Sequence, residues 1–366
     1  MNRGILFCLS PFLGYNWTRM TSMGDHNQLF KDRYAGRWVA VTGGAGFIGG
    51  HLCEQLLEIG AKVSIIDDLS GSDGNTIDEL MRRFGGGRVR FVYGSILEPA
   101  ALDEAVADAD YIFHLAAMGS VPRSLVEPER CLQVNTIGTM RVAQAARRSS
   151  VNRWVLAASS SAYGNDPVLP KSETQSLSPL SPYAASKLAG EFIVRTWSAS
   201  FGLPGVCLRY FNVFGSRQLA DNQYAAVVAS FMDKIRKGKQ PTIYGDGGQS
   251  RDFTHVSNAV HATLLAGACK GNFTGQSINV GTGRQTTVNE LARAIALLFG
   301  REDIEPIHEE PRQGDVPHSV ADISLAGELL GFTPITTLEK GLAETITWLT
   351  KDDSGYDHSP QTEPSA

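Results

Sequence analysis

A tyrosine and a lysine lie four residues apart in the stretch YAASK, Tyr183 to Lys187. On a helix, this spacing places both side chains on one face. A phenol ordinarily ionises at about 10, too high for a base at neutral pH, but a neighbouring ammonium stabilises the phenolate and lowers its pKa. The pair can therefore supply a general base, although the same spacing also occurs by chance on solvent-facing helices.

Three serines precede a second tyrosine in SSSAYG, Ser159 to Gly164. Alone, such a cluster indicates a turn. The preceding residues WVLAAS (154–159) have the composition of a buried strand, and doubly wound folds bind their ligands at the carboxyl ends of strands. A serine hydroxyl there can hold the substrate oxygen whose proton Tyr183 removes.

A glycine-rich turn follows the first predicted strand, with Gly43, Gly46 and Gly49 opening a helix. Glycines at this spacing allow a tight turn, close approach to a pyrophosphate and close helix packing. Asp67 ends the next predicted strand, about 20 residues further on, where a carboxylate binds the adenosine ribose hydroxyls. A carboxylate would repel a 2′-phosphate, so the pattern favours NAD over NADP; the alternative is that Asp67 and Asp68 only begin a turn.

Strand-length apolar runs alternate with segments of helical period from Arg37 onward. This alternation predicts an α/β fold with a doubly wound parallel (Rossmann) sheet. The predicted strands are 38–43, 62–68, 89–94, 111–117, 154–159 and 206–213, and the predicted helices include 51–60, 131–148 and 183–200.

Shorter, mixed elements follow Gly215 and predict a smaller C-terminal α/β substrate lobe. The segment 4–15 is mildly apolar, but Pro11 interrupts it and no cleavage site follows, so a signal peptide is disfavoured. The expected organisation is a poorly ordered extension (1–36), an NAD-binding Rossmann domain (37–214, joined again by 256–277), a substrate lobe (215–255 and 278–350) and a flexible tail (351–366).

Composition narrows the class of partner. The 366 residues carry a formal net charge of -5 with acids and bases interleaved, so a nucleic-acid or membrane-surface partner is not expected. Five cysteines are far apart with no Cys-x-x-Cys pair, which argues for free thiols in a reducing, cytoplasmic compartment and against a metal site. A small-molecule substrate is favoured.

These motifs together resemble the extended short-chain dehydrogenase/reductase family, specifically the NAD-dependent nucleotide-sugar epimerases and dehydratases. The resemblance extends from about Arg37 to Trp348. It also includes HLAA (114–117), VNTIGT (134–139), RYFNVFG (209–215), GDG (245–247), RDF (251–253), NVG (279–281) and RQGD (312–315).

The resemblance implies roles for individual residues. Ser159 would be the catalytic hydroxyl and Tyr183 the general base, with Lys187 lowering its pKa and holding the nicotinamide ribose. The implied cofactor contacts are Gly43, Gly46, Phe47, Ile48, Gly49, Asp67, Ser95, Ile96, Ala116, Asn135, Tyr183 and Lys187. The implied substrate contacts are Gly119, Ser120, Ser159, Ser160, Asn212, Arg251, Arg312 and Ser319, of which Asn212 and the two arginines would grip the nucleotide diphosphate of a UDP-sugar. A homodimer through the helices holding Asn135 and Tyr183 is also implied.

Three positions separate the members of the family. Similar dehydratases and decarboxylases carry an acid just after the catalytic hydroxyl, where this chain has Ser160 and Ser161, so reversible hydride transfer and 4-epimerisation are expected. A small residue at Ser319 resembles epimerases that admit UDP-N-acetylglucosamine and UDP-N-acetylgalactosamine, although a serine can also simply cap a turn. The alternatives are a UDP-glucose or UDP-glucuronate 4-epimerase, a keto-sugar nucleotide reductase, and a catalytically silent NAD-binding protein, which the intact catalytic residues disfavour.

Three positions depart from the family pattern or suggest another role. Ser95 stands where an aspartate usually contacts adenine, which removes a charge from that contact. Gly50 replaces a usual serine at some cost in helix propensity. His114 ends a predicted buried strand, and we expect a hydrogen-bonded core histidine there rather than a catalytic one.

Overall fold

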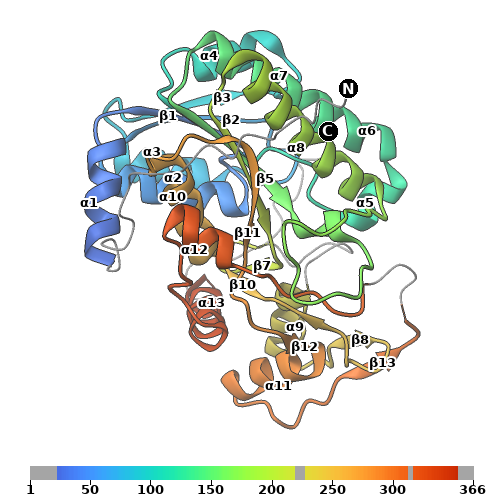
Figure 1. Ribbon diagram of the computed structural model, residues 1–366. Helices are drawn as coiled ribbons and strands as arrows, with labels where there is room; N and C mark the ends of the chain where they lie inside the picture. The colour runs from blue at the N-terminus through green and yellow to red at the C-terminus, as the bar shows by residue number, and fades with distance from the viewer. Residues whose placement is uncertain (1–22, 219–226, 312–315, 353–366) are drawn as a thin grey trace, which may run out of the picture.

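The computed structural model describes residues 23–218, 227–311 and 316–352 (Figure 1). A seven-stranded sheet in the order β11-β6-β5-β4-β1-β2-β3 forms its centre, and every neighbouring pair is parallel. The strands are β1 (Trp38–Thr42), β2 (Lys62–Asp67), β3 (Val89–Tyr93), β4 (Tyr111–His114), β5 (Arg153–Ser159), β6 (Gly205–Tyr210) and β11 (Thr274–Val280). The predicted doubly wound parallel sheet is confirmed, with β11 added to the six strands expected from the sequence.

Helices cover both faces of this sheet, so its central strands are buried apolar runs rather than alternating ones. One face packs against α1 (Met23–Tyr34), α2 (Phe47–Ile59), α3 (Asn75–Phe84), α10 (Val256–Ala268) and α12 (Ser324–Leu330). The other packs against α4 (Pro99–Val106), α7 (Thr139–Arg148) and α8 (Pro182–Phe201). The shorter elements α5 (Val121–Val126), α6 (Pro128–Leu132) and the π-helix η2 (Gln133–Gly138) lie between β4 and α7 along the chain.

A smaller lobe with its own apolar core lies at the carboxyl side of the sheet (Figure 1). Its helices are α9 (Val227–Arg236), α11 (Val288–Leu298) and α13 (Leu338–Asp352). They pack with pairs of very short strands: β7 (Val213–Phe214) with β10 (Thr254–His255), β9 (Ser250–Arg251) with β12 (Thr286–Thr287), and β8 (Thr242–Tyr244) with β13 (Ile307–Glu309). The predicted smaller α/β lobe is therefore present.

The extension expected to be poorly ordered contains helix α1, which corrects that expectation for residues 23–34. Phe30 and Tyr34 are buried, and the Tyr34 hydroxyl donates to the Leu264 carbonyl oxygen of α10 at 2.7 Å. A buried His26–His261 contact, 3.1 Å between ring nitrogens, adds a second link. Burial of an apolar helix face is what orders this segment.

The expected boundary of the substrate lobe is also wrong in part. Residues 278–280 lie in β11, at the edge of the large sheet, and α12 packs its buried Ala326 and Leu330 in the same core. The sequence-based boundary places both segments in the smaller lobe. Residues 1–22 and most of the expected tail, 353–366, lie outside the described residues.

Polar contacts hold the entry to the smaller lobe against the larger one. The Arg217 guanidinium, just after β7, donates to Glu54 of α2 at 2.8 Å and to Glu79 of α3 at 3.0 Å. The His51 ring of α2 hydrogen-bonds to the Ser216 carbonyl oxygen at 3.0 Å. The chain leaving the sheet is thus tied to the helix that follows the glycine-rich turn.

None of the helices in the described ranges is both long enough and apolar enough to span a bilayer.

Candidate active site

The amino terminus of α8 places Tyr183. Ser181 caps the helix by accepting the Ala184 N–H at 3.1 Å, and the buried Ser124 hydroxyl of α5 accepts the Tyr183 N–H at 3.1 Å. Two backbone donors that a helix start leaves unpaired are thereby satisfied. The Tyr183 phenol lies close enough to Ser159, at the carboxyl end of β5, for the serine hydroxyl to lower its pKa, so the structure brings the predicted tyrosine and serine together.

Two further hydrogen bonds orient the Ser159 hydroxyl. Its oxygen accepts from the Ser161 N–H at 3.2 Å and from the Ser161 hydroxyl at 2.9 Å. The Ser159 proton is therefore left to donate toward Tyr183 or toward an oxygen bound beside it. Ser161 is a positioning residue for this donor.

Burial shapes the electrostatics of the Tyr183 and Lys187 pair. It raises the pKa of Tyr183 above its ordinary value, with the Ser159 hydrogen bond acting in the opposite direction. It lowers the pKa of Lys187 to about 8, against the attraction of Glu191 one turn further along α8. The protein alone thus favours a neutral phenol, and a positive charge placed beside it would move its pKa downward.

Asn135 lies in the π-helix η2 and joins the loop after β4 to α8. Its Oδ1 accepts the Met118 N–H at 2.8 Å, and its Nδ2 donates to the Ser186 hydroxyl at 2.9 Å and to the Met118 carbonyl oxygen at 3.3 Å. These partners occupy the Asn135 amide, and its bond to Ser186 ties η2 to the first turn of α8, whose Tyr183 carbonyl oxygen accepts the Ser186 hydroxyl. The structure thus supports a positioning role more directly than the expected cofactor contact.

His114 is the expected core histidine, which the structure confirms. The Thr139 hydroxyl donates to the Asn135 carbonyl oxygen at 2.6 Å, so His114 Nε2–H must donate to Thr139 at 2.9 Å. His114 Nδ1 then accepts from the Thr42 hydroxyl at 2.7 Å. Burial lowers the pKa of His114 to about 3, and the neutral ring links the strand before the glycine-rich turn to Asn135.

The glycine-rich turn has the geometry that a pyrophosphate requires. Gly43 has φ +73°, and a Cβ on Gly49 would lie 2.0 Å from the Gly43 carbonyl oxygen. A Cβ on Gly46 would meet only that same oxygen, at 3.3 Å, so space above the turn is open. No side chain caps α2, whose first turn holds Phe47 and Ile48, and its N–H groups are left for an anion.

Asp67 lies beside this turn. Its Oδ2 accepts the Ala45 N–H at 3.0 Å and its Oδ1 accepts the Leu69 N–H at 2.9 Å, while burial raises the pKa of Asp67. Each oxygen keeps a lone pair for a ribose hydroxyl. Asp67 and Asp68 also accept backbone N–H groups of the turn that follows β2, as the alternative of a purely structural role expected. These bonds do not prevent Asp67 from binding a ribose hydroxyl as well.

The remaining expected cofactor residues line the same strand ends. Ser95 is half-buried and its hydroxyl accepts the Leu97 N–H at 3.3 Å. The Ile96 side chain is buried in the core beside Gly138, so any contact with adenine must use its backbone. The Ala116 N–H donates to the Thr42 hydroxyl at 3.2 Å.

Gly50 lies in α2, close to the start of α3. A Cβ on Gly50 would lie 2.7 Å from Thr76 Cγ2, which explains a glycine where similar chains carry serine.

The expected substrate residues come from both lobes. In the large lobe, Gly119 is exposed, and Ser120 caps α5 by accepting the Arg123 N–H at 3.2 Å. Ser160 begins a 3-10 turn directly after Ser159. Asn212 follows β6, is exposed and has a φ of +23°.

In the smaller lobe, Arg251 donates to the Pro317 carbonyl oxygen at 3.2 Å, and the Ser319 N–H donates to the Ser250 carbonyl oxygen at 3.1 Å. Arg251 and Ser319 therefore lie on adjacent segments. Arg312 lies outside the described residues.

A buried ion pair beneath the site was missed from the sequence. Arg209 of β6 donates to both carboxylate oxygens of Glu191 at 2.9 and 2.7 Å, and its Nη1 donates to the Tyr163 hydroxyl at 2.9 Å. Tyr163 in turn donates to Asn279 of β11 at 2.7 Å. Glu191 follows Lys187 by one helical turn, a spacing that could have suggested a shared face, but nothing in the sequence gives the partner across the sheet.

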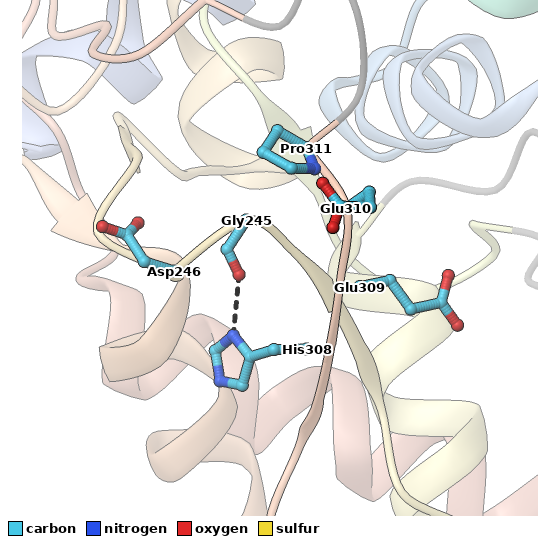
Figure 2. A pocket seen from close by; sticks show the side chains of 6 residues that line it. All are labelled: Gly245, Asp246, His308, Glu309, Glu310 and Pro311. Atoms are coloured by element: carbon cyan, nitrogen blue, oxygen red, sulfur yellow. Dashed lines mark hydrogen bonds between the residues drawn. The ribbon is translucent and has the colours of Figure 1, made fainter.

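A hollow of about 760 Å³ in the smaller lobe is not this site (Figure 2). It lies between the ends of β8 and β13 and is lined by Gly245, Asp246, His308, Glu309, Glu310 and Pro311. His308 Nδ1 donates to the Gly245 carbonyl oxygen at 2.8 Å. Its carboxylates would repel a diphosphate, and it contains none of the expected catalytic residues. Within the described ranges, no cluster of His, Cys, Asp and Glu is arranged to hold a metal ion.

A protein-family model matches most of the chain. The model of the NAD dependent epimerase/dehydratase family matches residues 39–281, which span the large sheet from β1 to the end of β11. The chain belongs to this family. The assignment agrees with the glycine-rich turn, with Asp67 and with the Tyr183 and Ser159 contact, and it makes the protein an NAD-dependent enzyme.

Three relatives illustrate the range of the epimerase/dehydratase family around this chain. A UDP-glucose 4-epimerase of Mycolicibacterium smegmatis is 39% identical over 84% of this chain and 96% of its own length. The solved UDP-N-acetylglucosamine 4-epimerase of Methanobrevibacter ruminantium M1, in complex with UDP-N-acetylmuramic acid, has a TM-score of 0.81 and 36% identity over 87% of this chain and 99% of its own. A Bacillus cereus UDP-glucuronic acid 4-epimerase, solved with UDP-glucuronic acid and NAD, has a TM-score of 0.79 and 29% identity over 86% and 99%.

Proposed function

We propose that the protein catalyses the reversible 4-epimerisation of a UDP-hexose, with UDP-N-acetylglucosamine and UDP-N-acetylgalactosamine as its substrate pair. The placement of the Tyr183 phenol beside Ser159 at the carboxyl end of β5, close enough for the serine hydroxyl to lower the pKa of the phenol, carries the proposal. It sets a base beside an oriented donor at the edge where a doubly wound sheet binds its ligands. UDP-sugar 4-epimerases among the relatives support the reaction class.

Bound NAD supplies the acceptor and later the donor of the C4 hydride. Tyr183 is placed to take the proton of the sugar 4′-hydroxyl and to return it after the sugar has turned over. The Ser159 proton, left free by Ser161, can donate to the same sugar oxygen as its charge develops. Lys187 places a cation on the same helix face and favours the phenolate.

The side chains after Ser159 limit the chemistry to hydride transfer. Ser160 and Ser161 provide hydroxyls and no carboxyl group, and elimination of water from C5 and C6 needs a proton acceptor at that place. The Ser161 hydroxyl is moreover occupied by Ser159. A keto-sugar intermediate would therefore be reduced again rather than dehydrated.

Substrate preference rests on the smaller lobe. Arg251, with its planar fork, suits a diphosphate oxygen, and the small side chain of Ser319 on the adjacent segment leaves space for an N-acetyl group. The relatives named for UDP-glucose and UDP-glucuronic acid define the competing preferences.

The test is to incubate the purified protein, without added NAD, with UDP-N-acetylglucosamine, UDP-glucose or UDP-glucuronic acid and to follow the anomeric protons by NMR. We expect the galacto-epimer to form fastest from the acetylated sugar. Faster turnover of either other sugar would overturn the substrate assignment and keep the reaction. No epimer from any of the three would overturn the reaction itself.

We also propose a cytoplasmic homodimer formed through α5, α6, η2 and α8. These elements expose large apolar side chains, namely Leu125, Val126, Leu132, Ile137 and Phe192. Exposed apolar groups gathered on neighbouring helices are typical of a protein interface. Light scattering of the native protein should give a mass of two chains. The Phe192→Glu variant should give the mass of a single chain, because it places a charge in the interface.

A further inference from the structure

Asp252, the residue directly after β9, is fully buried and accepts hydrogen bonds from segments that lie far apart in the sequence. Its Oδ1 accepts from the Thr282 N–H at 2.8 Å and from the Thr282 hydroxyl at 2.6 Å. Its Oδ2 accepts from the Gly283 N–H at 2.9 Å and from the Ala321 N–H at 3.2 Å. The carboxylate thus joins the turn after β11 to the segment that carries Ser319.

This segment, residues 317–321, runs parallel to β9 in a short backbone ladder. The Ser250 N–H donates to the Pro317 carbonyl oxygen at 2.9 Å, and the Ser319 N–H donates to the Ser250 carbonyl oxygen at 3.1 Å. Ala321, two residues beyond Ser319, presents its N–H to the same side, because backbone direction repeats every second residue in an extended chain. Its acceptor is the Asp252 side chain, which therefore extends the ladder past Ser319.

The packing around the Asp252 carboxylate leaves no space for another side chain. A Cβ on Gly281 would lie 2.6 Å from Asp252 Oδ2 and 2.7 Å from the Ala321 Cβ. Burial raises the pKa of Asp252, and its hydrogen bonds with Thr282, Ala321 and Gly283 oppose that shift. A buried carboxylate is tolerated where donors surround it in this way.

Closure of the turn after β11 accounts for the bonds to Thr282 and Gly283. It does not account for the bond to Ala321, which lies 69 residues further along the chain than Asp252. That bond fixes the distance between β9 and the residues around Ser319.

The opposite edge of the same segment has its own attachments. The Lys171 N–H donates to the Val320 carbonyl oxygen at 2.8 Å, and the Asp322 N–H donates to the Lys171 carbonyl oxygen at 2.9 Å. Asn279 Nδ2 donates to the Asp322 carbonyl oxygen at 3.2 Å. Loss of the Asp252 bond should therefore shift the segment without releasing it from the fold.

We propose that Asp252 is a positioning residue that fixes Ser319 at the sugar pocket and so governs the affinity for the sugar of the substrate rather than for its nucleotide. The inference rests on the proposed function, in which Arg251 holds the diphosphate and Ser319 adjoins the sugar. Arg251 is held independently of the carboxylate, because its backbone pairs with Thr286 of β12. Changes at the Asp252 side chain should therefore act on the sugar.

The test uses the full-length protein loaded with NAD and carrying Tyr183→Phe throughout, so that bound sugar is not turned over. Isothermal titration gives the Kd values for UDP-N-acetylglucosamine and for UDP. Asp252→Ala should raise the Kd for UDP-N-acetylglucosamine about tenfold, which corresponds to one hydrogen bond to a charged group, and that for UDP at most about twofold. Unfolded chains would lower the stoichiometry of binding and leave the Kd unchanged.

A second, milder variant keeps the shape of the side chain. Asp252→Asn has one acceptor oxygen and no charge, so its amide must either face a donor with its own NH2 group or bind Ala321 more weakly. It should raise the Kd for UDP-N-acetylglucosamine about threefold. The matched control is Asp246→Ala, an exposed aspartate of the same lobe that accepts the Gly248 N–H at 2.8 Å, and it should keep both native Kd values.

Equal increases in the two Kd values would make Asp252 a purely structural residue and overturn the proposal. Unchanged Kd values in both Asp252 variants would overturn it as well, and so would a native side chain at 252 that gives UDP-N-acetylglucosamine no tighter binding than UDP. These titrations need no turnover, so failure of the Asp252 assignment is distinguishable from failure of the epimerase assignment, which the NMR assay reports.

Discussion

The two lobes hold their functional residues in different ways. In the large lobe, the Asn135 side chain makes four hydrogen bonds at 2.8 to 3.4 Å, and Ser159 and Tyr183 are each oriented by nearby serines. In the smaller lobe, Arg251 lies on a two-residue strand and bonds to carbonyl oxygens, while Ser319 is held by its backbone.

This difference separates chemistry from selectivity. Proton transfer depends on hydrogen-bond distances between a base and its substrate, so the groups that perform it gain from rigid support. Selection between sugars depends on the shape of a pocket, which short strands and loops can change without disturbing the sheet. Substitutions in the large lobe should therefore reduce turnover or stability, whereas substitutions in the smaller lobe should change the sugar preference.

The largest effect should follow loss of the proposed base. Tyr183→Phe should lower epimerisation by about 1,000-fold or more, because general base catalysis contributes roughly that factor. The rate is measured by NMR, and the NAD content is measured by absorbance of the released cofactor. The control is Tyr163→Phe, whose phenol bonds to Asn279 and should leave most turnover intact. Activity within tenfold of native in Tyr183→Phe would refute the assignment.

Breaking the buried pair beneath the site should cost stability rather than selectivity. Glu191→Met leaves the Arg209 guanidinium buried and unpaired, which typically costs about 3–5 kcal/mol. Urea unfolding gives the free energy, and the double variant Glu191→Met/Arg209→Met should be more stable than the single one. Asp108→Asn, which removes an exposed pair with Arg90, should change the midpoint little. Equal losses of unfolding free energy in Glu191→Met and Asp108→Asn would contradict the expected difference between the buried and the exposed ion pair.

A change in the smaller lobe should alter the sugar preference and leave the fold intact. Ser319→Tyr should reduce turnover of UDP-N-acetylglucosamine relative to UDP-glucose by about 10- to 100-fold, because steric exclusion of a small group is worth about that much. The ratio of kcat/KM values measures it, with Ser319→Ala as the control that should keep the native ratio. An unchanged ratio in Ser319→Tyr would remove Ser319 from the sugar pocket.

The smallest effect is a pH dependence of stability in the large lobe. The folded protein keeps His114 neutral because burial lowers its pKa to about 3, whereas the unfolded chain takes up a proton at about 6.5. The stability that His114 contributes is present above pH 6.5 and is lost as the pH falls. Between pH 7.5 and 5.5, this loss should be about 1.4 kcal/mol.

His114→Asn should flatten the slope of unfolding free energy against pH by that amount, whatever its absolute stability. The exposed variant His308→Gln is the control and should keep the native slope. The same slope in His114→Asn as in the native chain would show that the ring is not held neutral.

Local rules explain which structural features the sequence predicted. The spacing of Gly43, Gly46 and Gly49 reflects backbone contacts within one turn, and the alternation of apolar runs reflects burial of each strand on both faces. Tyr183 and Lys187 are related by the helical period. These relations span few residues, so the sequence carried them directly.

The errors came from contacts between distant segments. The ordered α1 depends on Leu264 and His261 of α10, and the assignment of β11 to the large sheet depends on its pairing with β6. The bonds of the Asn135 amide to Met118 and Ser186 also join distant segments, and the expected contact of Asn135 with the cofactor stays a prediction. No spacing in the sequence reports such pairings.

The sequence by itself thus determined the sheet, the glycine-rich turn, the pairing of Asp67 with that turn and the helix that carries Tyr183 and Lys187, because propensity, period and turn sterics act over a few residues. Only the tertiary structure decided what holds these groups: the bond from Ser161 that frees the Ser159 proton, the Arg209–Glu191 pair and the bond from Ala321 to the Asp252 carboxylate. The physical reason is that hydrogen bonds and ion pairs between segments depend on the register of strands and the docking of helices, which the fold fixes as a whole.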